Sequence, residues 1–124
     1  IGLVPDGGAS WMLPRLVGKA QATRMMMLGE KIPAEEAERI GLIYKTVADE
    51  ALMGEAKALA VKLAGGPTVA LGEMKQTIRR GLEADFATTL QYEAEAQRVA
   101  GNSKDAMEGG MAFLQKRKPE FKGA

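Results

Sequence analysis

The sequence predicts a mostly α-helical chain of 124 residues with about two short strands. Apolar residues recur at helical spacing through most of the chain, and a glycine or proline ends nearly every such run. The extended, β-branched pattern of a strand occurs only at residues 1–4 and 42–47. Two strands are too few to form a stable sheet, so we expect both to pair with strands outside this chain.

Composition limits the chemistry available to the chain. The 17 basic and 16 acidic residues leave a net charge of +1, which favours neither a nucleic-acid nor a membrane partner. Cysteine and histidine are both absent, which excludes disulfides, thiolate zinc sites, cysteine nucleophiles and imidazole acid/base catalysis, and no metal site is predicted. Carboxylates, lysines, arginines, tyrosines and backbone amides remain.

The ends of the chain suggest its context. No apolar run approaches the roughly 20 residues that span a bilayer, and no segment resembles a signal peptide, so a cytoplasmic protein is expected. The chain begins with an apolar, strand-like Ile1 instead of Met, and we therefore expect it to be part of something longer.

Turn residues at 5–8 separate the first predicted strand from a helix over about residues 9–17, which Gly18 ends. A second helix over 19–28 is apolar around most of its circumference, which predicts burial on several sides, and Gly29 ends it.

Pro33 is suited to the first turn of a short helix that Gly41 closes. Partial alternation then predicts the second strand, over residues 42–47. Asp49 caps a helix that extends to about Ala64, with an apolar stripe at Leu52, Ala56, Leu59, Ala60 and Leu63.

Gly65, Gly66 and Pro67 break the chain before a helix whose apolar face ends at Leu82. A longer helix runs from about Phe86 to Gly101.

Asn102 or Ser103 caps the last predicted helix. Gly109 and Gly110 inside it predict the close approach of another backbone, as at a partner surface. The basic tail over residues 115–122 carries interleaved aromatics, which suits a phosphate-bearing ligand or a frayed terminus.

Asp6 is the strongest candidate for chemistry. It stands in a turn of proline and paired glycines directly before a helix, where a carboxylate is held in place and can move a proton. Spacing alone favours the simpler interpretation, in which Asp6 is a turn residue or the N-cap of the helix. Both interpretations stay open on the residues alone.

Several sequence motifs, spread in order over the entire chain, match the pattern of a known family. They are IGLVPDGG at residues 1–8, LPRLVG at 13–18, LGEKI at 28–32, AEEA at 34–37, GL at 41–42 and EGGMAFLQKRKPEF at 108–121. In this order and spacing the sequence resembles the crotonase superfamily of enoyl-CoA hydratases and isomerases.

The resemblance implies a crotonase-like α/β fold, a spiral of ββα units, of which this chain is the C-terminal part. Residues 1–47 would form the end of the spiral core with the active-site turn, and residues 48–124 the helical region that assembles trimers, often paired into hexamers. The two backbone amides of the family's oxyanion hole, its two hydratase glutamates and most of the CoA pocket would lie upstream of Ile1.

The resemblance also assigns site residues. Asp6 falls where hydratases usually carry glycine, and where dienoyl-CoA isomerases, ring-epoxide isomerases and a chlorobenzoyl-CoA dehalogenase carry aspartate. With Trp11 following as a substrate-binding residue, the turn is most similar to the ring-epoxide isomerases, although the order Gly7-Gly8-Ala9-Ser10 departs from theirs. Phe113 and Lys116 would contact the adenine and phosphate end of CoA, typically in a neighbouring subunit's site.

The implied function is an acyl-CoA isomerase or hydratase, with isomerase favoured, in which Asp6 moves a proton next to a stabilised thioester enolate. CoA would enter as part of the substrate, and no separate cofactor is expected. Two alternatives stay open: Asp6 as the nucleophile of a dehalogenase-like member, or a non-catalytic helical module that only oligomerises. On their own, these 124 residues are expected to be inactive.

Overall fold

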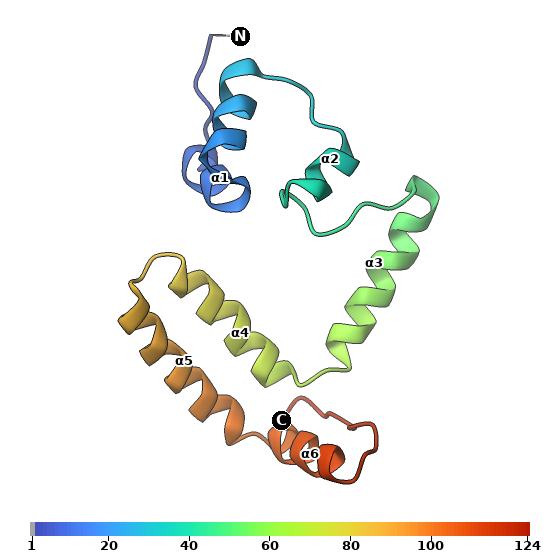
Figure 1. Cartoon of the computed structure of the whole chain (residues 1–124). Helices are drawn as coiled ribbons and strands as arrows, with labels where there is room; N and C mark the ends of the chain where they lie inside the picture. The colour runs from blue at the N-terminus through green and yellow to red at the C-terminus, as the bar shows by residue number, and fades with distance from the viewer. Residues whose placement is uncertain (1) are drawn as a thin grey trace. The chain divides into compact units, whose positions relative to one another are not determined.

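The computed structural model describes residues 2–124, in which six helices and no strand occur (Figure 1). The helices are α1 (Ala9–Leu28), α2 (Ala34–Arg39), α3 (Asp49–Ala64), α4 (Thr68–Gly81), α5 (Phe86–Gly101) and α6 (Lys104–Leu114). The chain divides into two compact units, Ile1–Leu52 and Met53–Ala124. The mostly helical class predicted from the sequence is confirmed for the described residues.

The prediction of two short strands is wrong for the residues described. Ile1 lies outside them, and residues 2–4 and 42–47 form no strand. The backbone N–H groups of Leu42 and Ile43 instead donate to the carbonyl of Ala37, and that of Thr46 donates to the Glu38 carboxylate at 2.7 Å. A strand exists only where a neighbouring strand accepts its hydrogen bonds, and α2 takes up these donors instead.

In the first unit, Gly18 interrupts α1 as predicted. Its φ of 77° and ψ of 159° are far from helical values, so α1 consists of two helical segments joined at this residue. Ala22 of the second segment is buried, and so is Ala37 of α2. Arg24 and Glu36 connect the two helices by an ion pair of 3.7 Å.

In the second unit, α4 and α5 pack against each other as a helical hairpin, and α5 contacts α6 (Figure 1). Side chains of Asp85 and Ser103 cap α5 and α6 by accepting backbone N–H groups from Thr88 and Ala106. Ser103 is thus the cap of the last helix. The remainder of the chain after α6 folds back along that helix and ends near its start, because Asp105 N–H donates to the Ala124 carbonyl at 3.0 Å.

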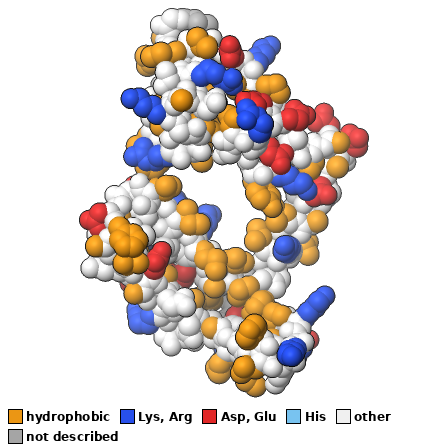
Figure 2. Space-filling view, in the orientation of Figure 1, with side chains coloured by type: hydrophobic (Ala, Val, Ile, Leu, Met, Phe, Trp, Pro, Cys, Tyr) orange, Lys and Arg blue, Asp and Glu red, His pale blue; other side chains and the backbone are white. Residues whose placement is uncertain are grey.

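Most of the predicted apolar stripes stay at the surface. The buried hydrophobic residues among those described are Ala22, Ala37 and Ala112, and α3 has no buried residue. In the second segment of α1, Met27 is 81% and Leu28 64% exposed, so the predicted burial on several sides is not observed at these residues. Figure 2 shows orange hydrophobic side chains at the surface of both units.

Candidate functional site

The turn that holds Asp6 is built from two left-handed glycines. Gly7 and Gly8 have φ values of 60° and 86°, the signs found at the centre of a type I′ turn, and the Ala9 N–H donates to the Asp6 carbonyl at 3.1 Å. Glycine adopts such values at little cost. The conformation therefore explains why two glycines follow Asp6.

The Asp6 side chain does not cap α1. Gly8 is the N-cap residue, its carbonyl accepts the Trp11 and Met12 N–H groups, and no side chain forms a capping hydrogen bond. Of the two simpler interpretations that spacing favoured, the N-cap is therefore wrong, whereas the turn residue agrees with the structure. Asp6 is an exposed turn residue, and its carboxylate is not committed to the helix end.

Trp11 lies in the first turn of α1, where Arg15 covers it. The Arg15 guanidinium sits 4.0 Å from the centre of the indole ring, and its Nη1 donates to the Trp11 carbonyl at 2.9 Å. A cation at this distance from an aromatic face is attracted by the ring's negative potential. Trp11 remains 41% exposed, so part of its side chain is available for contact while Arg15 packs over the ring.

Phe113 and Lys116 lie together at the C-terminal end of α6. The Lys116 N–H donates to the Phe113 carbonyl at 3.2 Å, and the Arg117 N–H donates to the Ala112 carbonyl at 3.0 Å. This pair of bonds, with a left-handed residue between, is a Schellman motif. Both side chains point away from the core, because Phe113 is 83% exposed and Lys116 is exposed as well.

The four predicted site residues thus form two pairs in different units. Asp6 and Trp11 belong to the first unit, at the start of α1, while Phe113 and Lys116 belong to the second, at the end of α6. Within each pair, a single local backbone motif sets the positions of both residues.

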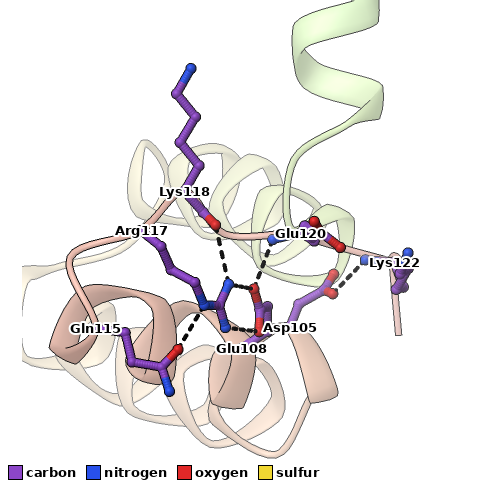
Figure 3. A network of polar contacts seen from close by, with 7 residues as sticks. All are labelled: Asp105, Glu108, Gln115, Arg117, Lys118, Glu120 and Lys122. Carbon is purple, nitrogen blue, oxygen red and sulfur yellow. Dashed lines mark hydrogen bonds and ion pairs between the residues drawn. The ribbon is translucent and has the colours of Figure 1, made fainter.

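Sequence reasoning missed a polar network beside Phe113 and Lys116 (Figure 3). Arg117 forms a two-pronged ion pair with Glu108, with Nη1–Oε1 at 2.5 Å and Nη2–Oε2 at 2.8 Å. Asp105, only 2% exposed, accepts the backbone N–H groups of Lys122 and Gly123 at 2.7 and 2.8 Å. Nothing in the spacing of these residues corresponds to a helical pair, so periodicity gives no signal for them.

The network shifts two pKa values. Hydrogen bonds from Arg117, and then from the Glu120 N–H, lower the pKa of Glu108 to about 2 from an ordinary 4.5. The same pairing raises the pKa of Arg117. Both side chains are therefore charged throughout the neutral range.

A surface groove of about 690 Å³ between α4 and α5 holds none of the predicted site residues. Its lining is mostly apolar, from Ala70 and Met74 on α4 to Leu90 and Ala100 on α5. Glu73, Thr77, Glu93 and Gln97 also line the groove, but it contains none of the residues that the sequence predicts for the site.

Neither a metal cluster nor a membrane-spanning helix occurs among residues 2–124. No group of three or more acidic side chains comes together there as a metal site. None of the helices in that part of the chain has the length and apolar character needed to cross a membrane.

Comparison with known proteins places these features in a family. A sequence model of the enoyl-CoA hydratase/isomerase family matches residues 1–124. The chain is 44% identical over 123 residues to the 1,2-epoxyphenylacetyl-CoA isomerase of Escherichia coli (strain K12), covering 99% of this chain and 47% of the relative. It is 45% identical over the same length to a probable enoyl-CoA hydratase of Rhodobacter capsulatus, covering 99% and 48%.

Solved structures of this family superpose closely on the chain. An enoyl-CoA hydratase from Geobacillus kaustophilus HTA426 superposes with a TM-score of 0.93 at 35% identity, over 99% of this chain and 47% of the other. A protein of Mycobacterium abscessus, described as a putative enoyl-CoA hydratase/isomerase, gives a TM-score of 0.91 at 41% identity, over the same shares. The chain thus has the fold of the C-terminal part of these crotonase-type proteins, and it spans about half the length of the relatives it matches.

Proposed function

Because this chain belongs to the enoyl-CoA hydratase/isomerase family, we propose that it supplies part of an acyl-CoA isomerase site in which Asp6 is the proton-transferring carboxylate. The observation that carries the proposal is the turn geometry. A hydrogen bond from the Ala9 N–H to the Asp6 carbonyl closes a turn through two left-handed glycines, and the Asp6 carboxylate forms no helix cap. A carboxylate that is carried on a hydrogen-bonded turn and has no structural task is suited to acid/base catalysis.

The proposed reaction needs no co-reactant. The Asp6 carboxylate takes a proton from a carbon of the acyl group, and the electron pair left behind is delocalised onto the thioester oxygen as an enolate. Asp6 then returns the same proton to a different carbon of the acyl chain or ring, which moves the double bond. Atoms and charge balance, and the carboxylate ends in its starting form.

Stabilisation of the enolate oxygen falls to groups outside these 124 residues, the backbone amides that the family resemblance implies. One such donor typically contributes about 3–4 kcal/mol to the transition state. Asp6 alone therefore cannot supply the catalysis, and the isolated chain is expected to be inactive. Turnover of an acyl-CoA by the purified 124-residue chain would contradict this.

The presence of Asp6 favours isomerisation over hydration as the proposed reaction. Overall similarity does not separate the two activities, because a relative called an isomerase and one called a probable hydratase are 44% and 45% identical to this chain. Aspartate at this position instead of glycine is the feature that the resemblance assigns to isomerases. The substrate class is an acyl-CoA thioester, and Trp11 would lie against its acyl part.

Phe113 and Lys116 would bind the nucleotide end of an acyl-CoA, typically one held in a neighbouring subunit's site. An exposed ring offers a stacking surface for adenine, and an ammonium group offers a compact charge for phosphate. CoA enters as part of the substrate, so no separate cofactor is proposed. A homotrimer, or a hexamer of two trimers, is the proposed assembly.

The test of Asp6 uses the complete gene product that contains this chain. Asp6→Asn keeps the size of the side chain but removes the proton acceptor, so turnover should fall about a hundredfold or more while acyl-CoA binding persists. Asp49→Asn, an exposed carboxylate at the start of α3, is the matched control and should retain activity. Wild-type turnover by Asp6→Asn would refute the assignment.

Mass spectrometry of the protein quenched during turnover distinguishes the kind of catalysis. Proton transfer leaves Asp6 unmodified at every time point. An acyl or aryl adduct on Asp6 would instead identify a nucleophile and replace the proposal.

A further inference from the structure

Lys116 holds a backbone conformation that ordinarily belongs to glycine. Its φ is 54°, and among the described residues it is the non-glycine residue with a positive φ. It occupies the position after the helix cap at which a Schellman motif usually carries glycine. The left-handed region costs an L-residue about 1–2 kcal/mol, so stability alone would favour glycine here. Strain that persists in this way is a signature of functional positions.

Contacts on both sides of Lys116 hold this conformation. Arg117, the next residue, donates two hydrogen bonds to Glu108, nine residues earlier in α6, and its Nε donates to Gln115 Oε1 at 2.7 Å. A further bond from Arg117 Nη1 reaches the Lys118 carbonyl at 3.1 Å. In Figure 3 the guanidinium lies among these three acceptors, so the backbone on either side of Lys116 cannot turn freely.

The rest of the tail is bound to the same helix. The Glu120 N–H donates to Glu108 Oε1 at 2.8 Å, and Asp105 accepts two N–H groups beyond it. The Phe121 ring lies 3.5 Å from where a Cβ on Gly109 would be. Gly109 thus receives the chain's own tail, where the sequence had suggested a partner surface. We refer to Asp105, Glu108, Arg117 and residues 118–124 as the C-terminal clasp.

The clasp leaves Lys116 as an available cation. Glu108 neutralises Arg117, whereas Lys116 forms no ion pair within the described part of the chain. Phe113 and Lys116 are both exposed, so neighbouring side chains do not fix them. Their relative position depends on the backbone between residues 113 and 117, which the clasp controls.

We propose that Glu108 and Arg117 are positioning residues that hold Phe113 and Lys116 as a preformed binder for the nucleotide end of CoA. This inference rests on the proposed function. Fixing the binding groups before the ligand arrives removes the cost of ordering them on binding. It also gives a reason for the strain at Lys116: the left-handed residue carries an ammonium group that glycine lacks.

The test compares two thioesters of the same acyl group in the complete gene product. One is the acyl-CoA, and the other is the acyl-pantetheine, which lacks the nucleotide. Glu108→Gln should lower kcat/KM for the acyl-CoA about tenfold and leave kcat/KM for the acyl-pantetheine unchanged. Arg117→Lys keeps the charge but loses the bidentate geometry, so it should also lower kcat/KM for the acyl-CoA relative to that for the acyl-pantetheine. This variant replaces Glu108→Gln in the test if Glu108→Gln folds poorly.

A matched control comes from the other unit. Glu36 and Arg39 form the same kind of two-pronged pair, with both bonds at 2.7 Å, and Glu36→Gln should leave the ratio of the two substrates unchanged. Amide hydrogen exchange provides a second readout. In Glu108→Gln the Glu120 and Lys122 amides should exchange faster than in the wild type, because the clasp opens.

The outcomes separate this inference from the proposed function. If Phe113→Ala and Lys116→Ala leave the ratio of the two substrates unchanged, the nucleotide site itself is absent. If they change it but Glu108→Gln and Arg117→Lys do not, the site stands and the positioning role is overturned. An equal loss on both thioesters, or unchanged amide exchange, would also overturn the positioning role.

Discussion

Lys116→Gly should stabilise the protein while impairing its proposed binding site. The φ of 54° costs a lysine about 1–2 kcal/mol, which glycine avoids. Part of this gain is lost because glycine gives the unfolded chain more freedom, worth roughly 0.5–1 kcal/mol. The exposed lysine side chain loses little packing on removal. The net expectation is an increase of about 0.5–1 kcal/mol in the free energy of unfolding.

The assay is denaturant unfolding of the wild type and two variants. Lys116→Ala is the control, because it removes the same ammonium group but keeps a Cβ and therefore the strain. Lys116→Gly should unfold at higher denaturant, with a melting temperature roughly 2–4 °C higher, and Lys116→Ala should not. Both variants should bind acyl-CoA about tenfold more weakly, because both lack the charge that contacts phosphate.

Equal stabilities of the glycine and alanine variants would refute the reasoning. Such a result would mean that the left-handed backbone at this position costs a lysine nothing. If Lys116→Gly is more stable but binds acyl-CoA as tightly as the wild type, the backbone strain at Lys116 is confirmed and its proposed role in binding is refuted.

Two further predictions concern the clasp. The lowered Glu108 pKa, about 2 against 4.5, means that its pairing stabilises the fold fully above pH 4.5 and loses this effect as the pH falls toward 2. Unfolding midpoints of wild type and Glu108→Gln should therefore converge over that interval, and a difference independent of pH would contradict the pairing. Gly123→Ala places a Cβ 2.8 Å from Thr68 Oγ1 at a φ of 75°, which should cost about 1–2 kcal/mol or release the tail. Faster exchange of the Gly123→Ala tail amides would confirm release, whereas wild-type stability and exchange would refute the close contact.

Helix positions could be predicted from the sequence because individual helix-starting and helix-breaking residues determine them. Gly18 breaks α1, Pro33 precedes α2, and Ser103 caps α6, each for a reason contained in the residue itself. The strand at residues 42–47 was mispredicted for the opposite reason. A strand depends on a partner strand, and β-branched composition does not reveal whether one is present.

The candidate site likewise contains residues that could be predicted from the sequence and residues that could not. Asp6 and its glycine turn could be found from the sequence, because the need for left-handed residues selects glycine. The pairing of Glu108 with Arg117 could not, since the two residues are nine positions apart across a helix end. Only the reversal of the chain after α6 brings them together. The family resemblance drew attention to Phe113 and Lys116, but not to the contacts that hold them.

Backbone geometry, more than packing, positions each of the two pairs of proposed site residues. The buried hydrophobic residues described are three alanines, and a core of such small side chains cannot lock exposed groups in place. At Asp6 the constraint is a turn that the Ala9 N–H closes and that requires two left-handed glycines, and at Lys116 it is a left-handed lysine held by the clasp. Side chains anchored in this way can be changed with little loss of core contacts. Substitutions that keep the backbone conformation, such as Asp6→Asn and Lys116→Ala, should therefore report on function separately from folding, whereas substitutions in the clasp alter both.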